Sequence, residues 1–242
     1  MRQEKVSESG TERADPNENH YNREVKSGAG LGIDCAILCA APCRGTKPQG
    51  GAQGARRVVE KIVPLLDCTE PRMAGVDQDI VVSKWIGLEG TVMLAKKHYN
   101  RLRERFPLRM IEEAVGFDKY LSVIPEAATA MKSGVCGMRE ISRGGILAGL
   151  WEMAQEAGVG LEVNLREIPV RQETIEICEF FGENPYELLS GGCLLMTTTD
   201  GNGLVEALHR EEIPAVRIGR TTKGNDRVLY NEGRKRFLNK PR

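Results

Sequence analysis

Hydrophobic and polar residues recur with two different periods from about residue 77 onward. Between Gly144 and Ala157 apolar side chains return every three or four residues, which predicts an amphipathic helix that stops at Gly158. The β-branched run Asp79–Ser83 and the alternating run Gly160–Leu165 predict strands. Further predicted strands are Gly134–Met138, Cys193–Thr197, Ala215–Gly219 and Asp226–Tyr230. Further predicted helices are Thr91–Arg105, Leu108–Ala114, Ala127–Lys132, Gln172–Phe181, Pro185–Leu189 and Gly203–Glu211. Strands that alternate with helices favour an α/β or α+β domain with helices packed on a sheet.

The first part of the chain has a different texture. Residues 1–26 carry many charges and no apolar cluster, so we expect a disordered tail. Beyond it, we expect a short strand at Ala36–Leu38, a loop or linker at Cys43–Gly54 and one short amphipathic helix at Arg56–Leu66. No comparable periodicity links these pieces into a second complete domain.

Composition narrows the possible functions. The chain has 242 residues with 34 Lys and Arg against 34 Asp and Glu, so we expect neither nucleic acid nor an anionic membrane as its main partner. No run of about 18 apolar residues predicts a membrane helix, and the polar N-terminus has no secretory signal. We therefore expect a cytoplasmic protein, with its seven cysteines as free thiols in a reducing compartment.

The most informative local feature is a glycine turn between a predicted strand and the strongest predicted helix. Ser142 is a candidate N-cap, and Gly144 and Gly145 would let a ligand approach the backbone. Free amides at a helix start favour an anion such as phosphate, and Arg143 adds a guanidinium that suits phosphate oxygens. Alternatively, the two glycines only permit close packing of helix on sheet, and the local sequence leaves both interpretations open.

Two further glycine-rich loops have weaker signals. Ser190 and Gly191 precede a predicted strand, where they form either a tight turn or a wall of the same site. The stretch Gly28–Gly32 is followed by Asp34, but its spacing is not that of a dinucleotide-binding turn. Asp34 is either a turn residue or a carboxylate for a nucleotide with bound Mg²⁺.

The cysteine and histidine spacings do not favour a structural metal. Cys35, Cys39 and Cys43 are each separated by three residues and have no evident fourth ligand nearby, unlike structural zinc or iron–sulfur sites. The three histidines are scattered, so they suggest no catalytic triad or dyad.

Residues 77–238 resemble the C-terminal domain of the AIR synthase-related proteins, with the hydrogenase maturation factor HypE and its relatives as the nearest branch. Four stretches carry the resemblance: Asp79–Thr91, Met138–Leu165, Ile168–Leu189 and Ser190–Asn225. The resemblance implies an α+β domain with helices packed on a mixed sheet. It also implies that ATP, bound between two domains, phosphorylates an amide-type oxygen and makes it a leaving group, and that dimers form through the N-terminal domains.

The sequence also departs from the family pattern. The family's turn has the form D-x-T-x-G-G, and the matching positions here are Glu140 and Ser142, which keep the functional groups. Of two adjacent acids common near the family's N-terminus, Asp34 matches one and Ile33 replaces the other. No segment here matches the acidic, threonine-rich parts of the N-terminal domain, and the chain does not end in the cysteine through which HypE works.

The sequence therefore predicts a tail at 1–26, a remnant of the ATP-binding domain and linker at 27–76, and an AIR synthase-related domain at 77–238. We expect ATP-dependent activation of an amide- or carbamoyl-type oxygen. The expected partners are a nucleotide or phosphorylated small molecule, a second copy of the chain, or a maturation protein. A non-catalytic assembly module that has lost ATP chemistry is the alternative, and a damaged reading frame is a third possibility. The predicted phosphate and ATP ligands are Glu140, Ser142, Arg143, Gly144, Gly145, Ser190, Gly191 and Asp34.

Overall fold

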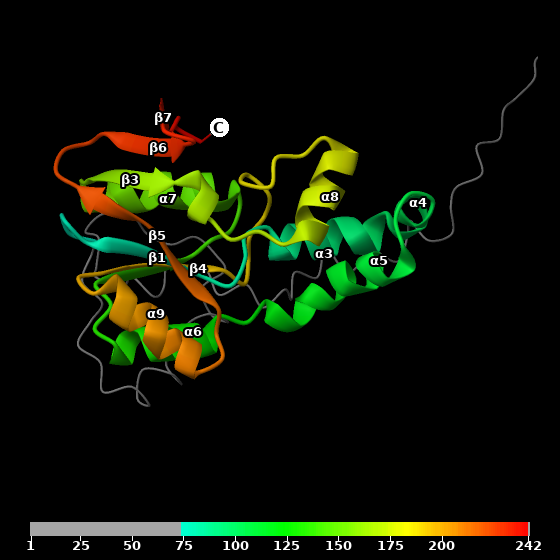
Figure 1. Ribbon diagram of the computed structural model, residues 1–242, viewed down its shortest axis with the longest axis horizontal. Helices are drawn as coiled ribbons and strands as arrows, with labels where there is room; N and C mark the ends of the chain where they lie inside the picture. Colours follow the sequence, from blue (N-terminus) through cyan, green and yellow to red (C-terminus); the bar gives the residue numbers. More distant parts are fainter. Residues whose placement is uncertain (1–73, 242) are drawn as a thin grey trace, which may run out of the picture. The chain divides into compact units, whose positions relative to one another are not determined.

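A seven-stranded mixed sheet organises the part of the chain that the computed structural model describes, residues 74–241 (Figure 1). The order is β2-β4-β1-β5-β3-β6-β7, and among these described neighbours β3 and β6 alone run parallel. The strands are β1 (Asp79–Ser83), β2 (Gly137–Glu140), β3 (Gly160–Asn164), β4 (Leu194–Thr198), β5 (Ala215–Thr222), β6 (Arg227–Asn231) and β7 (Arg234–Phe237). The α-helices are α3 (Leu88–Lys97), α4 (Tyr99–Arg103), α5 (Leu108–Val115), α6 (Ile124–Lys132), α7 (Gly145–Ala157), α8 (Gln172–Phe181) and α9 (Gly201–Arg210), and two 3₁₀ helices are η3 (Gly116–Tyr120) and η4 (Leu165–Glu167). The predicted α+β class is confirmed.

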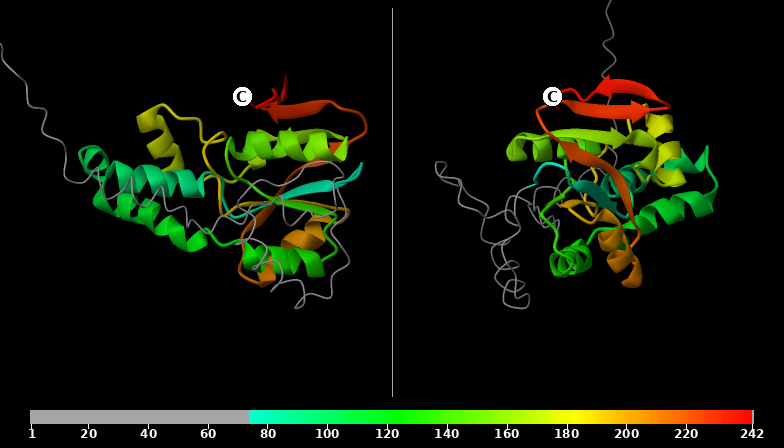
Figure 2. Two further views of the ribbon diagram at one scale, coloured as in Figure 1. Left: turned by 180° about the vertical axis from the view of Figure 1, so that it is seen from behind. Right: turned by 60° about the vertical axis from the view of Figure 1, so that its left-hand side comes forward.

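Helices cover both faces of the sheet (Figures 1 and 2). Alternation along β1 shows how the sequence specifies the two layers. Ile80 and Val82 pack in the apolar cluster that contains Leu150 of α7, whereas Val81 between them packs in the cluster that contains Leu204 of α9. Helix α6 joins α9 on that second face. Because neighbouring side chains point to opposite sides of the sheet, a single apolar strand contributes side chains to two separate hydrophobic cores.

A further group of helices packs beyond the end of the sheet. Helices α3, α4, α5 and α8 enclose their own apolar cluster, and Figure 1 shows them together on one side of the sheet. The buried members of this cluster are Ala95, Leu102, Ile111, Ala114 and Ile177. The apolar core of this helical group is therefore separate from the two cores on the faces of the sheet.

Two predicted helices were wrong in detail. The single helix expected at Thr91–Arg105 is interrupted at His98, whose φ of −115° and ψ of 27° leave the helical region. The helix expected at Pro185–Leu189 is a series of turns. There the carbonyl of Tyr186 accepts a hydrogen bond from the backbone N–H of Leu147 in α7 at 3.3 Å. This carbonyl thus bonds to another element and not within a local helix. The sequence pattern also missed β7, because its four residues are all exposed and show no alternation.

Several predictions fall on residues outside 74–241. These are the tail, the strand at Ala36–Leu38, the loop at Cys43–Gly54 and the helix at Arg56–Leu66. Among the helices of residues 74–241, none is long and apolar enough to cross a membrane. The described cysteines, Cys136, Cys178 and Cys193, are free thiols, as predicted.

Lys84 connects the end of β1 to the segment that runs from η3 into α6. Its ammonium donates hydrogen bonds to the carbonyl oxygens of Tyr120 and Ser122 at 2.6 Å each and forms an ion pair with Glu126 at 2.6 Å. Lys84 is 5% exposed and Glu126 is 3% exposed. Since a lysine ammonium has three N–H groups, these three oxygens account for all of them. The Lys84 ammonium is thus paired and fully hydrogen-bonded, whereas Oε2 of Glu126 has no hydrogen-bond partner among the described residues.

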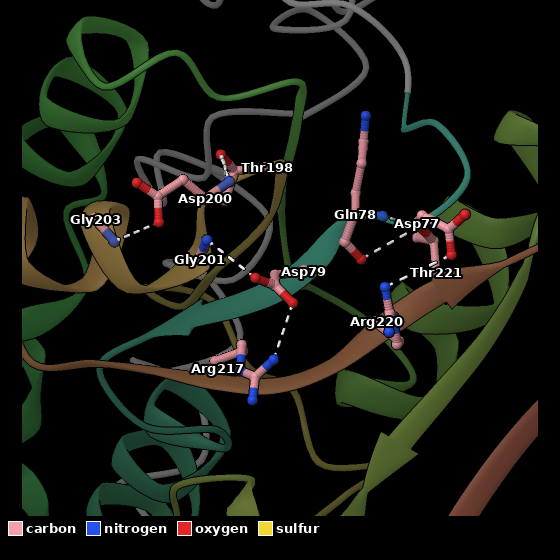
Figure 3. A network of polar contacts seen from close by, with 10 residues as sticks. All are labelled: Asp77, Gln78, Asp79, Thr198, Asp200, Gly201, Gly203, Arg217, Arg220 and Thr221. Carbon is pink, nitrogen blue, oxygen red and sulfur yellow. Dashed lines mark hydrogen bonds and ion pairs between the residues drawn. The ribbon is translucent and has the colours of Figure 1, made fainter.

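At the opposite end of β1, two carboxylates hold the start of α9 (Figure 3). Asp79 accepts a hydrogen bond from the N–H of Gly201 at 3.1 Å, and Asp200 caps the helix by accepting from Gly203 at 2.9 Å. Asp79 also pairs with Arg217 of β5 at 3.0 Å. Amides in the first turn of a helix lack partners within the helix, so these contacts fix where α9 begins.

We predict that Lys84→Met destabilises the fold by about 3–5 kcal/mol, because it leaves the Glu126 carboxylate buried without its cation. Urea unfolding followed by circular dichroism measures this change. Lys96→Met is the matched control, since Lys96 pairs with Asp118 at 3.2 Å on the surface and exposed pairs contribute about 0–1 kcal/mol. Equal effects of the two substitutions would show that the Lys84 pair is not a structural anchor.

Candidate functional site

The predicted phosphate turn connects β2 to α7. Its glycines have left-handed backbone angles, with φ of 75° at Gly144 and 62° at Gly145, a conformation that other residues adopt with strain. The prediction that Ser142 caps the helix was wrong, because Gly144 occupies the N-cap position and no side chain caps α7. Instead, the carbonyl of Ser142 accepts from the N–H of Gly145 at 3.2 Å and closes the turn.

Gly145 has a packing role. A Cβ atom at this position would lie 2.8 Å from the Leu188 carbonyl oxygen and closer still to that of Tyr186. The backbone of residues 186–188 therefore approaches α7 so closely that only glycine fits. The bond from the Leu147 N–H to Tyr186 noted above reinforces this contact. Two amides of the helix start, those of Gly145 and Leu147, already bond to protein oxygens.

Three residues of the turn nevertheless face solvent. Ser142, Arg143 and Gly144 are exposed, whereas Glu140 and Gly145 on either side are buried. An exposed hydroxyl, an exposed guanidinium and a glycine that permits close approach are groups suited to binding phosphate oxygens. Of the predicted ligands in this turn, these three are the ones that a ligand in solvent can reach.

The second glycine loop lies against the first. The Ser190 N–H donates to the Ser142 carbonyl at 3.4 Å, so the structure brings the two loops together. The Ser190 side chain is fully buried, and its hydroxyl accepts from the Gly87 N–H at 2.8 Å while donating to the Leu188 carbonyl at 2.7 Å. Its hydroxyl therefore connects the loop to the start of the helical group.

Two acidic side chains hold the second loop by its amides. The Gly192 N–H donates to Glu140 at 3.0 Å, and the Gly191 N–H donates to Glu89 in the first turn of α3. Burial raises the pKa of the Glu140 carboxyl, an effect that the Gly192 bond opposes and the nearby Glu89 charge adds to. Burial likewise raises the pKa of Glu89 against its bond from Gly191. Protonation of either carboxyl is thus coupled to the structure of this loop.

Sequence reasoning missed three charged residues near the loops: Lys84, Glu89 and Glu126. Each lies in or beside an apolar run, and its partner is distant in the chain, so no local spacing identifies it. The residue after the loop, Cys193, is fully buried, and its thiol donates to the Ser83 carbonyl at 3.1 Å. Burial raises the pKa of this thiol, which makes Cys193 a poor nucleophile.

The remaining predicted ligand, Asp34, lies outside the described residues. Within residues 74–241 no group of three or more His, Cys, Asp or Glu side chains is arranged to hold a metal ion. The described part of the site therefore consists of the exposed turn and the second glycine loop packed against it.

We predict that Gly145→Ala destabilises the protein well beyond a control glycine. The left-handed φ alone costs roughly 1–2 kcal/mol for an alanine, and the collision with residues 186–188 adds about 1–3 kcal/mol. Gly134→Ala is the control, because Gly134 has a φ of 73° but open space around it. Denaturant unfolding of both variants gives the comparison, and equal losses would contradict the packing role of Gly145.

We also predict that Glu140→Gln changes how stability depends on pH. Because the pKa of Glu140 is raised from 4.5 in the folded protein, the unfolded chain loses this proton first as pH rises above 4.5. The wild type therefore loses stability as pH rises from 4.5 through the folded pKa. Because glutamine does not titrate, Glu140→Gln removes this pH-dependent loss of stability. Thermal unfolding measured from pH 4 to 8 should show that the stability of Glu140→Gln increases relative to that of the wild type as pH rises. Glu104→Gln, at an exposed position after α4, is the control, and parallel profiles for all three proteins would contradict the prediction.

The chain is similar in sequence to carbamoyl dehydratase HypE proteins. It is 36% identical over 67 residues to carbamoyl dehydratase HypE of Rhodobacter capsulatus, covering 28% of this chain and 20% of that protein. It is 24% identical over 155 residues to a putative hydrogenase expression/formation protein of Methanocaldococcus jannaschii, covering 62% of this chain and 44% of that protein. The chain thus spans less than half the length of these relatives.

Solved structures show the same fold. A crystal structure of E. coli HypE matches with a TM-score of 0.54 at 22% identity, over 71% of this chain and 52% of that one. A chain of the HypE–HypF complex matches with a TM-score of 0.54 at 20% identity, over 71% of this chain and 55% of that one. HypE in complex with ATP matches with a TM-score of 0.50 at 20% identity, over 70% and 52%.

A family match covers most of the described domain. Residues 75–231 match the family described as AIR synthase related protein, C-terminal domain. This range contains all seven described strands except β7, together with both glycine loops. The chain belongs to the AIR synthase-related family through its C-terminal domain.

Proposed function

We propose that this protein takes part in ATP-dependent activation of an amide- or carbamoyl-type oxygen, as HypE-like members of its family do. In this chemistry the carbonyl oxygen attacks the γ-phosphorus, ADP leaves, and the oxygen later departs as part of phosphate. Such a reaction depends on positioning and on charge stabilisation around the phosphoryl group. The observation that carries the proposal is the exposed turn Ser142–Gly144, which lies within the residues that match the family.

In this proposal the residues of the turn hold phosphate oxygens. The Arg143 guanidinium supplies charge and paired donors, the Ser142 hydroxyl supplies one more donor, and Gly144 leaves room for the ligand. Glu140 and Ser190 act behind them, because they fix the second loop against the turn. Mg²⁺ would be shared between the phosphates and Asp34. The ATP complex of a HypE relative supports a nucleotide as the ligand.

Two partners belong to this proposal. One is a maturation protein, as the solved HypE–HypF complex suggests by similarity. The other is a second copy of the chain, because AIR synthase-related proteins form dimers. The remaining predicted part of the site, residues 27–76, would contribute the N-terminal side of the nucleotide site.

One observation favours a second candidate, a non-catalytic assembly module. The amides of Gly145 and Leu147 bond to carbonyl oxygens of Ser142 and Tyr186, so part of the helix start is already occupied. A domain that has kept its fold while losing ATP chemistry would retain this packing. Nucleotide binding separates the two candidates.

We predict that isothermal titration calorimetry of the full chain detects Mg-ATP binding. Arg143→Ala should weaken it about tenfold or more, the loss expected for one charge-assisted hydrogen bond. Arg103→Ala is the matched control, because Arg103 is an exposed arginine on α4, away from the turn. An absence of binding at millimolar Mg-ATP would overturn the ATP proposal and favour the assembly module.

A further inference from the structure

A cavity of about 690 Å³ lies beside the predicted phosphate turn. It is lined by the first turn of α7, strands β6 and β7, and the last described residues of the chain, and it is open to solvent on one side. Gly144 is the one predicted phosphate ligand that lines it. The volume falls in the range of roughly 300–1,000 Å³ that is usual for small-molecule sites. The cavity is therefore large enough for a ligand and largely separate from the turn's exposed side chains.

The wall of the cavity has an apolar part. Leu147 of α7 and Leu165 of η4 contribute to it, together with Leu229 of β6 and Leu238 after β7. Leu229 and Leu238 are also members of the core cluster beneath the sheet's α7 face, where they are 6% and 7% exposed. This part of the wall is thus fixed by the core, and it suits an apolar body about the size of an aromatic ring.

Cations line the same cavity. Arg166, Arg236 and Lys240 contribute to its lining, against one acidic residue, Glu187. Arg166 pairs with Glu232, which leaves Arg236 and Lys240 as the lining cations for which no ion pair is found among the described residues. The surrounding sequence is basic as well, since residues 215–242 contain nine Lys and Arg but two Asp and Glu in a chain of zero net charge. An anionic group would be attracted to this cavity.

We propose that this cavity binds a small molecule with one anionic group, a phosphate or a carboxylate, attached to an apolar body the size of a ring system. Arg236 and Lys240 bind the anionic group, and the leucines contact the apolar body. The site does not depend on the proposed ATP chemistry, because Arg143 and Ser142 do not line it.

The opposing interpretation is that these cations only protect an exposed sheet edge. Strand β7 pairs with β6 and is the outermost described strand, and Lys or Arg on such an edge discourages aggregation. The two interpretations differ in which cations matter. Arg236 lies opposite Leu229 in the ladder and Lys235 lies opposite Tyr230, so the two side chains point to opposite faces of the sheet. Lys235 does not line the cavity and is the matched control.

The probe is 8-anilinonaphthalene-1-sulfonate, which combines one anionic group with apolar rings and fluoresces when bound. We predict saturable binding of one probe per full-length chain. The double variant R236Q/K240Q should weaken that binding about tenfold or more, the effect of one lost charge-assisted hydrogen bond. K235Q and Arg143→Ala should each change it less than about twofold. N-phenyl-1-naphthylamine, which lacks the sulfonate, should bind the wild type and R236Q/K240Q alike.

Competition identifies the anionic group. Displacement of the probe by phenyl phosphate assigns a phosphate ligand, and displacement by benzoate assigns a carboxylate ligand. The proposal is overturned if the probe does not saturate, if neither competitor displaces it, or if K235Q weakens binding as much as R236Q/K240Q. Since Arg143→Ala reports on the ATP site alone, failure of one proposal is distinguishable from failure of the other.

Discussion

The ammonium group of Lys84 lies where the sheet meets the helices beyond its end. Three oxygen atoms surround it, and two of them are backbone carbonyls of the segment that enters α6. A buried charge is tolerated only when it is paired and hydrogen-bonded, so the positions of Tyr120, Ser122 and Glu126 are all tied to the end of β1. The neighbouring Ser83 hydroxyl accepts from the N–H of Leu194, which starts β4 directly after the second glycine loop. The candidate site is therefore built on this junction.

The two glycine loops are positioned by close backbone packing and by buried polar side chains. Gly145 is needed because the backbone of residues 186–188 crosses α7 too closely for a side chain. Ser190, Glu140 and Glu89 then hold the second loop through its backbone groups. This rigid framework leaves the short exposed segment Ser142–Gly144 in a fixed position. A site whose supporting residues are locked by packing can position a phosphate without reorganising.

The sequence predicted the elements whose patterns are strong. Strand β1 and helix α8 begin and end where the periodicity places them, because each has a buried face along its whole length. Strand β7 has no buried face, and the turns around Tyr186 depend on a contact with α7. Neither could therefore be predicted from the local sequence pattern. In the site, motif spacing located the turn but assigned the cap to Ser142. Lys84 and Glu126 were not predicted from the sequence, because their ion pair joins segments that are distant in the chain.

We propose that the exposed turn before α7 is the phosphate-binding element of this domain. The most direct measurement is the backbone amide spectrum of ¹⁵N-labelled protein during a titration with Mg-ATP. We predict the largest shifts at Arg143 and Gly144, and smaller ones at Gly191 and Gly192, whose amides already bond to carboxylates. Shifts that cluster away from this turn, or no shifts at saturating nucleotide, would contradict it.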